Sequence, residues 1–374
     1  MSDPIIDAVA ISLQARLPCN IEGAPGTGKT SITKAIVGRM GETAHTVILS
    51  VRDATDQGGL PSIATDPQTG EKYVVMVPPA WARNVKRDGK GVVIFDEFTT
   101  APGGVQNSAL RVVNERYAGD TYLGDEVSFV LISNPPQYSV AVNELIPTMA
   151  NRLLHFSWPF KPRDWTEASR KGFPAPEIPR VSSCWRELVQ VYRIYYTEFL
   201  DSRPELALKW PEQISAQSGA WPSPRMWDQL AHALAAAESA GHGPKSKVAS
   251  VLCDAAIGEG PAKEFRSWFV NRDLPDPESI LSNPKGAAVP TRQDQQMVTL
   301  ASVAASAVRP HAKLVERYRA AWAYWSRVCG DKPDVGFSAA RIMAFHAPAG
   351  IERDIPPEIS KVIPLLQKSG INLG

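Results

Sequence analysis

Short apolar runs alternate with amphipathic segments along the first half of the chain. Each run has the length of one buried strand, and each amphipathic segment repeats its apolar side chains every three or four residues, as a surface helix does. The predicted strands are residues 19–22, 45–51, 92–95, 127–132 and 153–156, and the predicted helices are residues 4–17, 30–40, 104–117 and 144–152. This alternation predicts an α/β fold, with a parallel sheet sandwiched between two layers of helices.

The second half of the chain has a different pattern. Helical spacing of apolar residues dominates from residue 160 onward, and prolines become frequent, which is typical of many short helices with firm ends. Residues 273–290 are rich in proline, aspartate, serine and glycine, which indicates a linker. We therefore predict an αβα core over residues 1–158, an all-α domain over 159–285 and a C-terminal helical extension over 286–374.

Two segments inside the predicted core have the pattern of β-hairpins. The apolar run at residues 73–77 follows a turn at residues 66–70 and can pair with the residues around Ile63. Residues 119–127 carry Gly-Asp pairs on both sides of an apolar centre at Tyr122. Both hairpins would be additions to the parallel sheet.

Residues 23–30 read Gly-Ala-Pro-Gly-Thr-Gly-Lys-Thr and fit the pattern G-x-x-x-x-G-K-[ST] in full. Glycines let such a loop turn its N–H groups toward a phosphate, and the helix that follows adds a partial positive charge. A predicted strand precedes the loop and a predicted helix follows it, so we set aside an accidental glycine-rich turn. The residues expected to bind the nucleotide are Gly23, Ala24, Pro25, Gly26, Thr27, Gly28, Lys29, Thr30 and Ser31, together with Asp96.

Two acidic residues end the predicted strand at residues 92–95. Ligands of open α/β sheets bind at the carboxyl ends of the strands, which is where Asp96 and Glu97 lie. We expect Asp96 and Thr30 to hold Mg²⁺, and Glu97 to act as the general base that activates a water molecule. The alternative is that these acids only end the strand and are solvated. Asn134 follows the next strand, at residues 127–132, and could orient that water or contact the terminal phosphate.

Composition adds limits on the class of protein. The 374 residues are 44% hydrophobic and 21% charged, with a formal net charge of +1, so nothing global favours nucleic acid or anionic membrane. The basic residues Arg83, Lys86, Arg87 and Lys90 form either a solvated helix face or an interface. The chain begins without a signal-peptide pattern and has no apolar run long enough for a membrane, and its four cysteines are widely spaced. We expect a cytoplasmic protein with reduced cysteines and no membrane insertion.

The order of these motifs resembles that of AAA+ ATPases, and the MoxR branch in particular. The resemblance rests on Asp96-Glu97, on Asn134 after its strand, on Arg152, and on Ser223-Pro224-Arg225, and it covers residues 1–270. It implies that Asn134 is sensor 1, that Arg152 is an arginine finger acting on the neighbouring subunit's γ-phosphate, and that Arg225 is sensor 2 in an α-helical lid. The two hairpins would be the inserts that face a central pore.

The chain departs from the MoxR pattern around the arginine. Asn151 stands where the family has aspartate, and Leu153 where it has phenylalanine. Arg116 is therefore a second, weaker candidate for the arginine finger.

The resemblance implies a homo-oligomer, a hexameric ring that hydrolyses ATP with Mg²⁺ and remodels or activates a client protein. Adaptor or client partners of von Willebrand type or of metallopeptidase type are expected by the same resemblance. Two other functions stay open: a nucleic-acid-dependent motor, against which the near-neutral charge argues, and a nucleotide-gated scaffold, against which Glu97 argues.

Overall fold

The computed structural model describes residues 3–138, 143–270, 275–309, 311–329, 333–348 and 363. The chain forms two compact units. The first comprises residues 1–179, 206–230 and 250–262, and the second comprises residues 180–205, 231–249 and 263–374. The three-domain division at residues 158 and 285 stays a prediction, and residues 273–274 of the predicted linker lie outside the described residues, as does most of the extension after residue 348.

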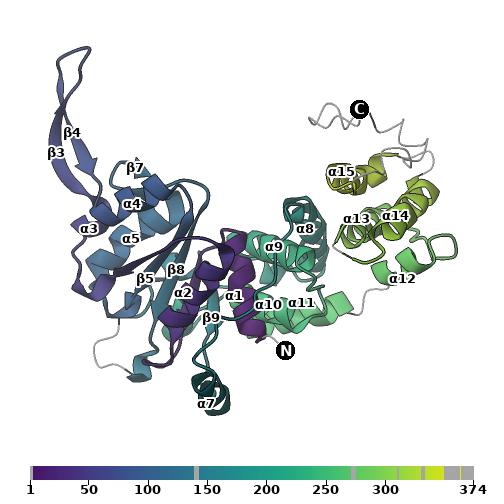
Figure 1. Cartoon of the computed structure of the whole chain (residues 1–374), viewed down its shortest axis with the longest axis horizontal. Helices are drawn as coiled ribbons and strands as arrows, with labels where there is room; N and C mark the ends of the chain where they lie inside the picture. The colour runs from purple at the N-terminus through teal and green to yellow at the C-terminus, as the bar shows by residue number, and fades with distance from the viewer. Residues whose placement is uncertain are drawn as a thin grey trace. The chain divides into compact units, whose positions relative to one another are not determined.

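A five-stranded parallel sheet forms the centre of the first unit (Figure 1). Its strands are β1 (Cys19–Glu22), β2 (Ala44–Ile48), β5 (Gly91–Asp96), β8 (Val127–Ser133) and β9 (Leu154–Ser157), in the order β2-β5-β8-β1-β9. The sheet confirms the α/β prediction and all five predicted strands. One detail was wrong: strand β2 lies at the edge of the sheet and is only partly buried, and residues 49–51 form a 3₁₀ turn, η1 (Leu49–Val51), instead of continuing it.

Helices cover both faces of this sheet. They are α1 (Pro4–Gln14), α2 (Lys29–Met40), α4 (Ala80–Asp88), α5 (Gly103–Glu115) and the short α6 (Pro147–Ala150). Because successive strand side chains point to opposite faces, Phe95 and Phe129 pack with α4, α5 and α6 in one core. Ser128, the neighbour of Phe129, points to the other face, where its hydroxyl donates a hydrogen bond to the carbonyl of Leu13 in α1. Both faces of the sheet are therefore covered by helices, which gives the αβα sandwich that the apolar strands predict.

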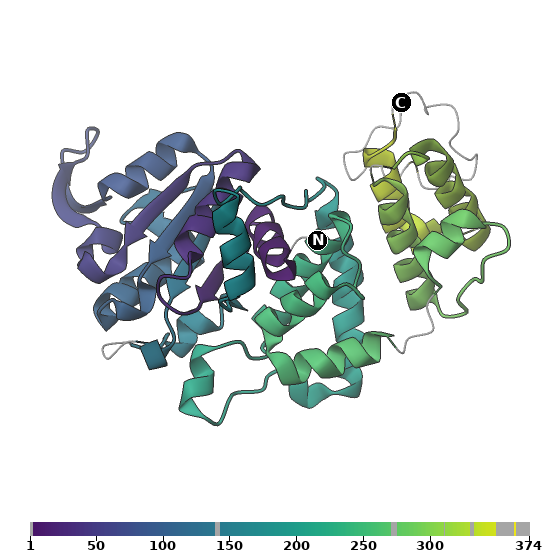
Figure 2. The same ribbon diagram turned by 60° about the horizontal axis from the view of Figure 1, so that its bottom comes forward.

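Two hairpins extend the first unit, as predicted. Strand β3 (Leu60–Thr65) pairs with β4 (Lys72–Val77), and this long hairpin projects away from the sheet in both views (Figures 1 and 2). Its apolar side chains are in water, since Ile63 is 73% exposed and Val74 is 65% exposed. The second hairpin lies earlier than predicted and is shorter: β6 (Tyr117–Ala118) pairs with β7 (Thr121–Tyr122).

The two hairpins meet at the base of the long one. The N–H of Asp120 donates to the carbonyl of Met76, and the N–H of Met76 donates to the Asp120 carboxylate at 2.7 Å. The approach requires Gly119, because a Cβ there would lie 2.5 Å from the Met76 carbonyl oxygen and its φ is +58°.

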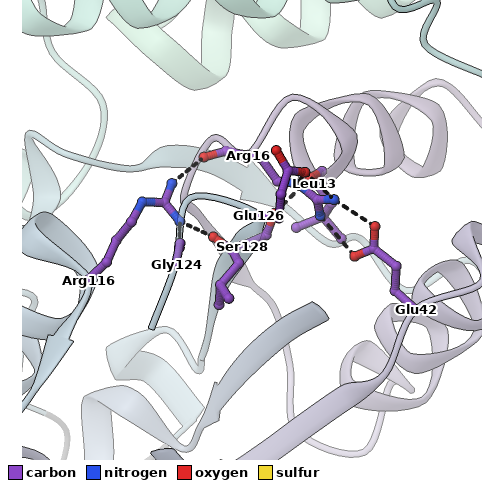
Figure 3. A network of polar contacts seen from close by, with 8 residues as sticks. Leu13, Arg16, Glu42, Arg116, Gly124, Glu126 and Ser128 are labelled. Atoms are coloured by element: carbon purple, nitrogen blue, oxygen red, sulfur yellow. Dashed lines mark hydrogen bonds and ion pairs between the residues drawn. The ribbon is translucent and has the colours of Figure 1, made fainter. Parts of the chain in front are cut away.

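A polar network fastens the amino ends of the strands (Figure 3). Arg16 precedes β1 and donates to both oxygens of Glu42 and to Glu126. Arg116 donates to the main-chain oxygens of Val127, Gly124 and Arg16, and its guanidinium lies over the ring of Phe129. Arg116 is thus held by contacts within its own chain, at the amino ends of the strands.

The second unit is α-helical, as predicted for the C-terminal part of the chain. Its helices include α8 (Trp185–Ser202), α12 (Pro277–Ser282), α13 (Gln293–Ala307), α14 (Leu314–Cys329) and α15 (Phe337–Phe345). Three helices have residues in both units: α9 (Pro224–Ser239), α10 (Lys247–Ile257) and α11 (Glu259–Val270). Helix α7 (Pro162–Arg170) belongs to the first unit. A buried polar contact lies among these helices, where the Tyr192 hydroxyl donates to Glu238 at 2.7 Å. Within the described part of the chain, no helix is both long and apolar enough to cross a membrane. All four cysteines are buried.

Candidate functional site

The phosphate loop joins β1 to α2 in the predicted strand–loop–helix context. Gly26 and Gly28 have φ of +74° and +87°, the left-handed conformation that glycine adopts without strain. Gly28 is the N-cap of α2 and no side chain caps this end, so the first N–H groups of the helix face the loop without a side-chain acceptor. Such N–H groups are the natural donors for a phosphate.

Trp158 makes hydrogen bonds to the phosphate loop and to the strand that precedes it. Its N–H donates to the carbonyl of Glu22 at 2.6 Å, and its indole Nε1 donates to the carbonyl of Thr27 at 3.2 Å. A Cβ on Gly23 would lie 2.6 Å from the carbonyl oxygen of Trp158, so only glycine fits at this position. The sequence placed Trp158 at the end of the core, but gave no signal for this contact with the loop.

Lys29 connects the loop to the neighbouring strand β8. Its Nζ donates to the carbonyls of Gly23 and Ala24 at 2.7 and 2.9 Å, and to Oδ1 of Asn134 at 2.9 Å. Lys29 is only 6% exposed, and burial lowers the pKa of its ammonium group, against the opposing effect of Asp96. A buried cation held by neutral oxygens would gain a charged partner when a phosphate enters the loop.

Thr30 and Asp96 lie side by side across the loop and β5. The Thr30 hydroxyl donates to Oδ2 of Asp96 at 2.8 Å. Magnesium ions prefer oxygen ligands and commonly take one or two from the protein, with phosphate and water oxygens completing the shell. This hydroxyl–carboxylate pair has the oxygen atoms that Mg²⁺ prefers, and the metal role of Thr30 and Asp96 stays a prediction.

Glu97 leaves the line of strand β5 and turns toward η1. Its φ is +55°, an uncommon conformation for a residue with a side chain. The Ser50 hydroxyl donates a hydrogen bond to Oε2 of Glu97. Sequence reasoning missed Ser50, because it placed residues 45–51 in one buried strand. The sequence did offer a signal: Ser50 is a polar residue near the end of an apolar run, where the strand would reach the same edge of the sheet as Glu97.

If Glu97 is the base that the sequence predicts, replacing Ser50 by alanine should raise basal ATP hydrolysis several-fold, since the Ser50 hydroxyl occupies one carboxylate oxygen of Glu97 and holds the side chain toward η1. Phosphate release by the purified protein without added partners measures the effect. Ser108→Ala is the matched control, because the Ser108 hydroxyl donates to the carbonyl of Val105 within α5, away from Glu97. A lower rate in the Ser50→Ala variant than in the wild type would contradict this role.

Asn134 is held in place by Thr99. The Thr99 hydroxyl accepts from the N–H of Asn134 and donates to its carbonyl, each over 3.3 Å, and Thr99 is only 4% exposed. The Asn134 side chain is thereby directed to Lys29. The structure thus brings five predicted site residues to one edge of the sheet, namely Lys29, Thr30, Asp96, Glu97 and Asn134.

Arg152 and Arg225 lie elsewhere. Strand β9 begins at Leu154, so Arg152 precedes its amino end, whereas the phosphate loop follows the carboxyl end of the adjacent strand β1. Arg152 donates to Oδ1 of Asn114 at 2.8 Å and to the carbonyl of Thr148. The parallel sheet therefore separates both arginines from the phosphate loop of their own copy, since Arg225 donates to the carbonyl of Asn151 at 3.2 Å.

The two arginines are neighbours. Burial lowers the pKa of Arg152, and the positive charge of Arg225 lowers it further. Two guanidinium groups that repel each other in this way would both be stabilised by an anion placed between them.

No known family model matches the chain, and no curated protein matches it. Solved structures align with part of the chain at low similarity. A predicted ATPase from Cytophaga hutchinsonii aligns with a TM-score of 0.44 and 14% identity over 68% of this chain and 81% of its own. A full-length MCM homologue from Methanopyrus kandleri aligns with a TM-score of 0.36 and 15% identity over 71% of this chain and 54% of its own. With TM-scores below 0.5 and identities near 15%, neither alignment carries an argument about this chain.

Proposed function

We propose that the chain is a MoxR-like AAA+ ATPase that hydrolyses ATP at the carboxyl edge of its parallel sheet. One observation carries the proposal: Lys29 contacts Asn134 and Thr30 contacts Asp96, so residues from three strand ends meet around the phosphate loop. A loop with uncapped N–H groups, a buried lysine and a hydroxyl–carboxylate pair is suited to a nucleoside triphosphate with Mg²⁺.

Each side chain has a role in this proposal. Residues 23–31 bind the phosphates, with Lys29 on the β- and γ-phosphates. Thr30 and Asp96 hold Mg²⁺, which when bound neutralises charge on the phosphate oxygens. Glu97 takes a proton from water, the water oxygen bonds to the γ-phosphorus, and the bond to the β-phosphate oxygen breaks to give ADP and phosphate. Asn134 orients the water or the γ-phosphate.

The remaining residues act between copies of the chain. Arg152 and Arg225 lie at the opposite end of the strands from their own phosphate loop, so we propose that both reach the triphosphate bound by a neighbouring copy. Head-to-tail contacts form a ring when the rotation between copies closes on itself, and a hexameric ring is the assembly we propose.

The work of the ring would be to remodel or activate a client protein in the cytoplasm. Support comes from the β3–β4 hairpin, whose exposed apolar side chains include Leu60, Ile63 and Val74. An apolar projection of this kind suits contact with polypeptide, whereas nucleic-acid binding depends on cationic side chains along the contact. Client or adaptor partners of von Willebrand or metallopeptidase type stay part of the proposal.

A lysine replacement tests the proposed ATP site. Lys29→Ala should weaken ATP binding about 10- to 100-fold, the effect of losing one charge-assisted hydrogen bond to phosphate. Titration with a fluorescent ATP analogue measures it. Lys34→Ala is the matched control, because Lys34 is an exposed lysine on the same helix. Equal affinities for the two variants would refute an ATP site in this loop.

A further inference from the structure

A buried asparagine connects the two arginines. Asn151 lies between α6 and β9, directly before Arg152, and is only 7% exposed. Its Oδ1 accepts from the Ser223 hydroxyl at 2.6 Å, and its Nδ2 donates to the carbonyl of Trp221 at 3.2 Å. Its main-chain carbonyl accepts from Nη1 of Arg225. One residue therefore makes three hydrogen bonds to the segment that begins helix α9.

Ser223 directly precedes helix α9 and fixes which way the Asn151 amide points. The Ser223 hydroxyl accepts from the N–H of Met226, as an N-cap does, so its single hydrogen is left for Oδ1 of Asn151. Nδ2 of Asn151 must then face the Trp221 carbonyl, which needs a donor. The site thus requires an acceptor and a donor on one short side chain, and an amide provides both.

Aspartate would not replace this amide. Its two oxygens both accept, so one would face the Trp221 carbonyl without a hydrogen, and a buried acceptor pair of this kind is destabilising. A second contact joins the same two segments of the chain: Nε2 of Gln229 in α9 donates to the carbonyl of Arg152 at 3.1 Å. The start of α9 is therefore tied to two consecutive residues, Asn151 and Arg152.

We propose that Asn151 is a positioning residue that holds Arg152 and Arg225 together as one unit, to be presented to the triphosphate of a neighbouring copy. This inference rests on the proposed ATPase function. It adds that the two guanidinium groups do not act independently: their spacing depends on the Asn151–Ser223 contact between residues 72 positions apart in the chain.

The test compares ADP binding, which needs one copy of the chain, with ATP hydrolysis, which is proposed to need two neighbouring copies. Asn151→Ala and Asn151→Asp should leave ADP affinity within about twofold of wild type, since ADP contacts only the phosphate loop of its own copy. ATP hydrolysis by the assembled protein should fall about 10-fold, the effect of losing one buried hydrogen bond. Adding Asn151→Ala to Arg225→Ala should cause little further loss, because the link acts through Arg225. Ser223→Thr keeps the hydroxyl and should retain more activity than Ser223→Ala.

Two results would overturn the inference. One is a parallel loss of ADP affinity and hydrolysis in Asn151→Ala, as expected if the residue only supports folding. The other is a double variant whose loss equals the product of the two single losses.

Amide hydrogen exchange separates failure of this link from failure of the proposed function. In Asn151→Ala the N–H groups of Met226 and Trp227, at the start of α9, should exchange faster while those of α2 stay unchanged. This result is expected even in a protein that hydrolyses no ATP, and unchanged exchange at Met226 would refute the link itself.

Discussion

Replacing Arg152 by alanine should lower ATP hydrolysis about 10³- to 10⁵-fold and leave ATP binding intact. The guanidinium is proposed to stabilise charge that develops on a neighbour's γ-phosphate during the reaction, while the phosphate loop that binds ATP lies at the other end of the sheet. Steady-state phosphate release and equilibrium ATP binding, measured on the same preparation, separate the two effects. Full turnover by the Arg152→Ala variant would show that this arginine does not act as a finger.

Mixing two inactive variants tests whether Arg152 acts between copies. Lys29→Ala lacks a working phosphate loop but keeps Arg152, and Arg152→Ala has the opposite defect. Random assembly in equal amounts should make roughly a quarter of the sites complete, because half of the loops work and half of their neighbours carry the arginine. No recovery of hydrolysis in mixed assemblies, with exchange of copies verified, would argue against a shared site.

Replacing Glu97 by glutamine should lower hydrolysis about 10²- to 10⁴-fold and leave ATP trapped on the protein, because glutamine cannot take a proton from water. Glu97 is exposed, and its N–H donates to the carboxylate of Asp96, which also accepts from Thr30 of the loop. Gel filtration after incubation with labelled ATP, followed by identification of the retained nucleotide, measures the trapping.

A control carboxylate distinguishes a specific effect from a loss of charge. Glu115→Gln removes a carboxylate at the end of α5, where Glu115 pairs with Arg111 at 3.3 Å. This variant should release ADP and phosphate as the wild type does. Rapid product release by Glu97→Gln would mean that another group acts as the base.

The sequence predicted the phosphate loop, the acidic pair and the strands because each depends on neighbouring residues. A strand needs a short apolar run, and the loop needs glycines at Gly26 and Gly28, where φ is positive. The error at residues 49–51 has the opposite cause. The run is β-branched and apolar, but β2 pairs with β5 only as far as Ile48, opposite Asp96, where β5 also ends, so no neighbouring strand continues the pairing through residues 49–51.

The sequence by itself therefore determined the fold class, the phosphate loop and the identity of the residues that gather at the carboxyl edge, since parallel strands bring their ends together wherever they lie in the sheet. Only the tertiary structure decided how distant residues are paired: Ser50 with Glu97, Asn151 with Ser223, and Arg116 with its own chain. It also decided that Arg152 lies at the far end of the strands from Lys29. These pairings depend on strand order and on the crossovers between strands, which spacing along the chain narrows to a few topologies but does not fix.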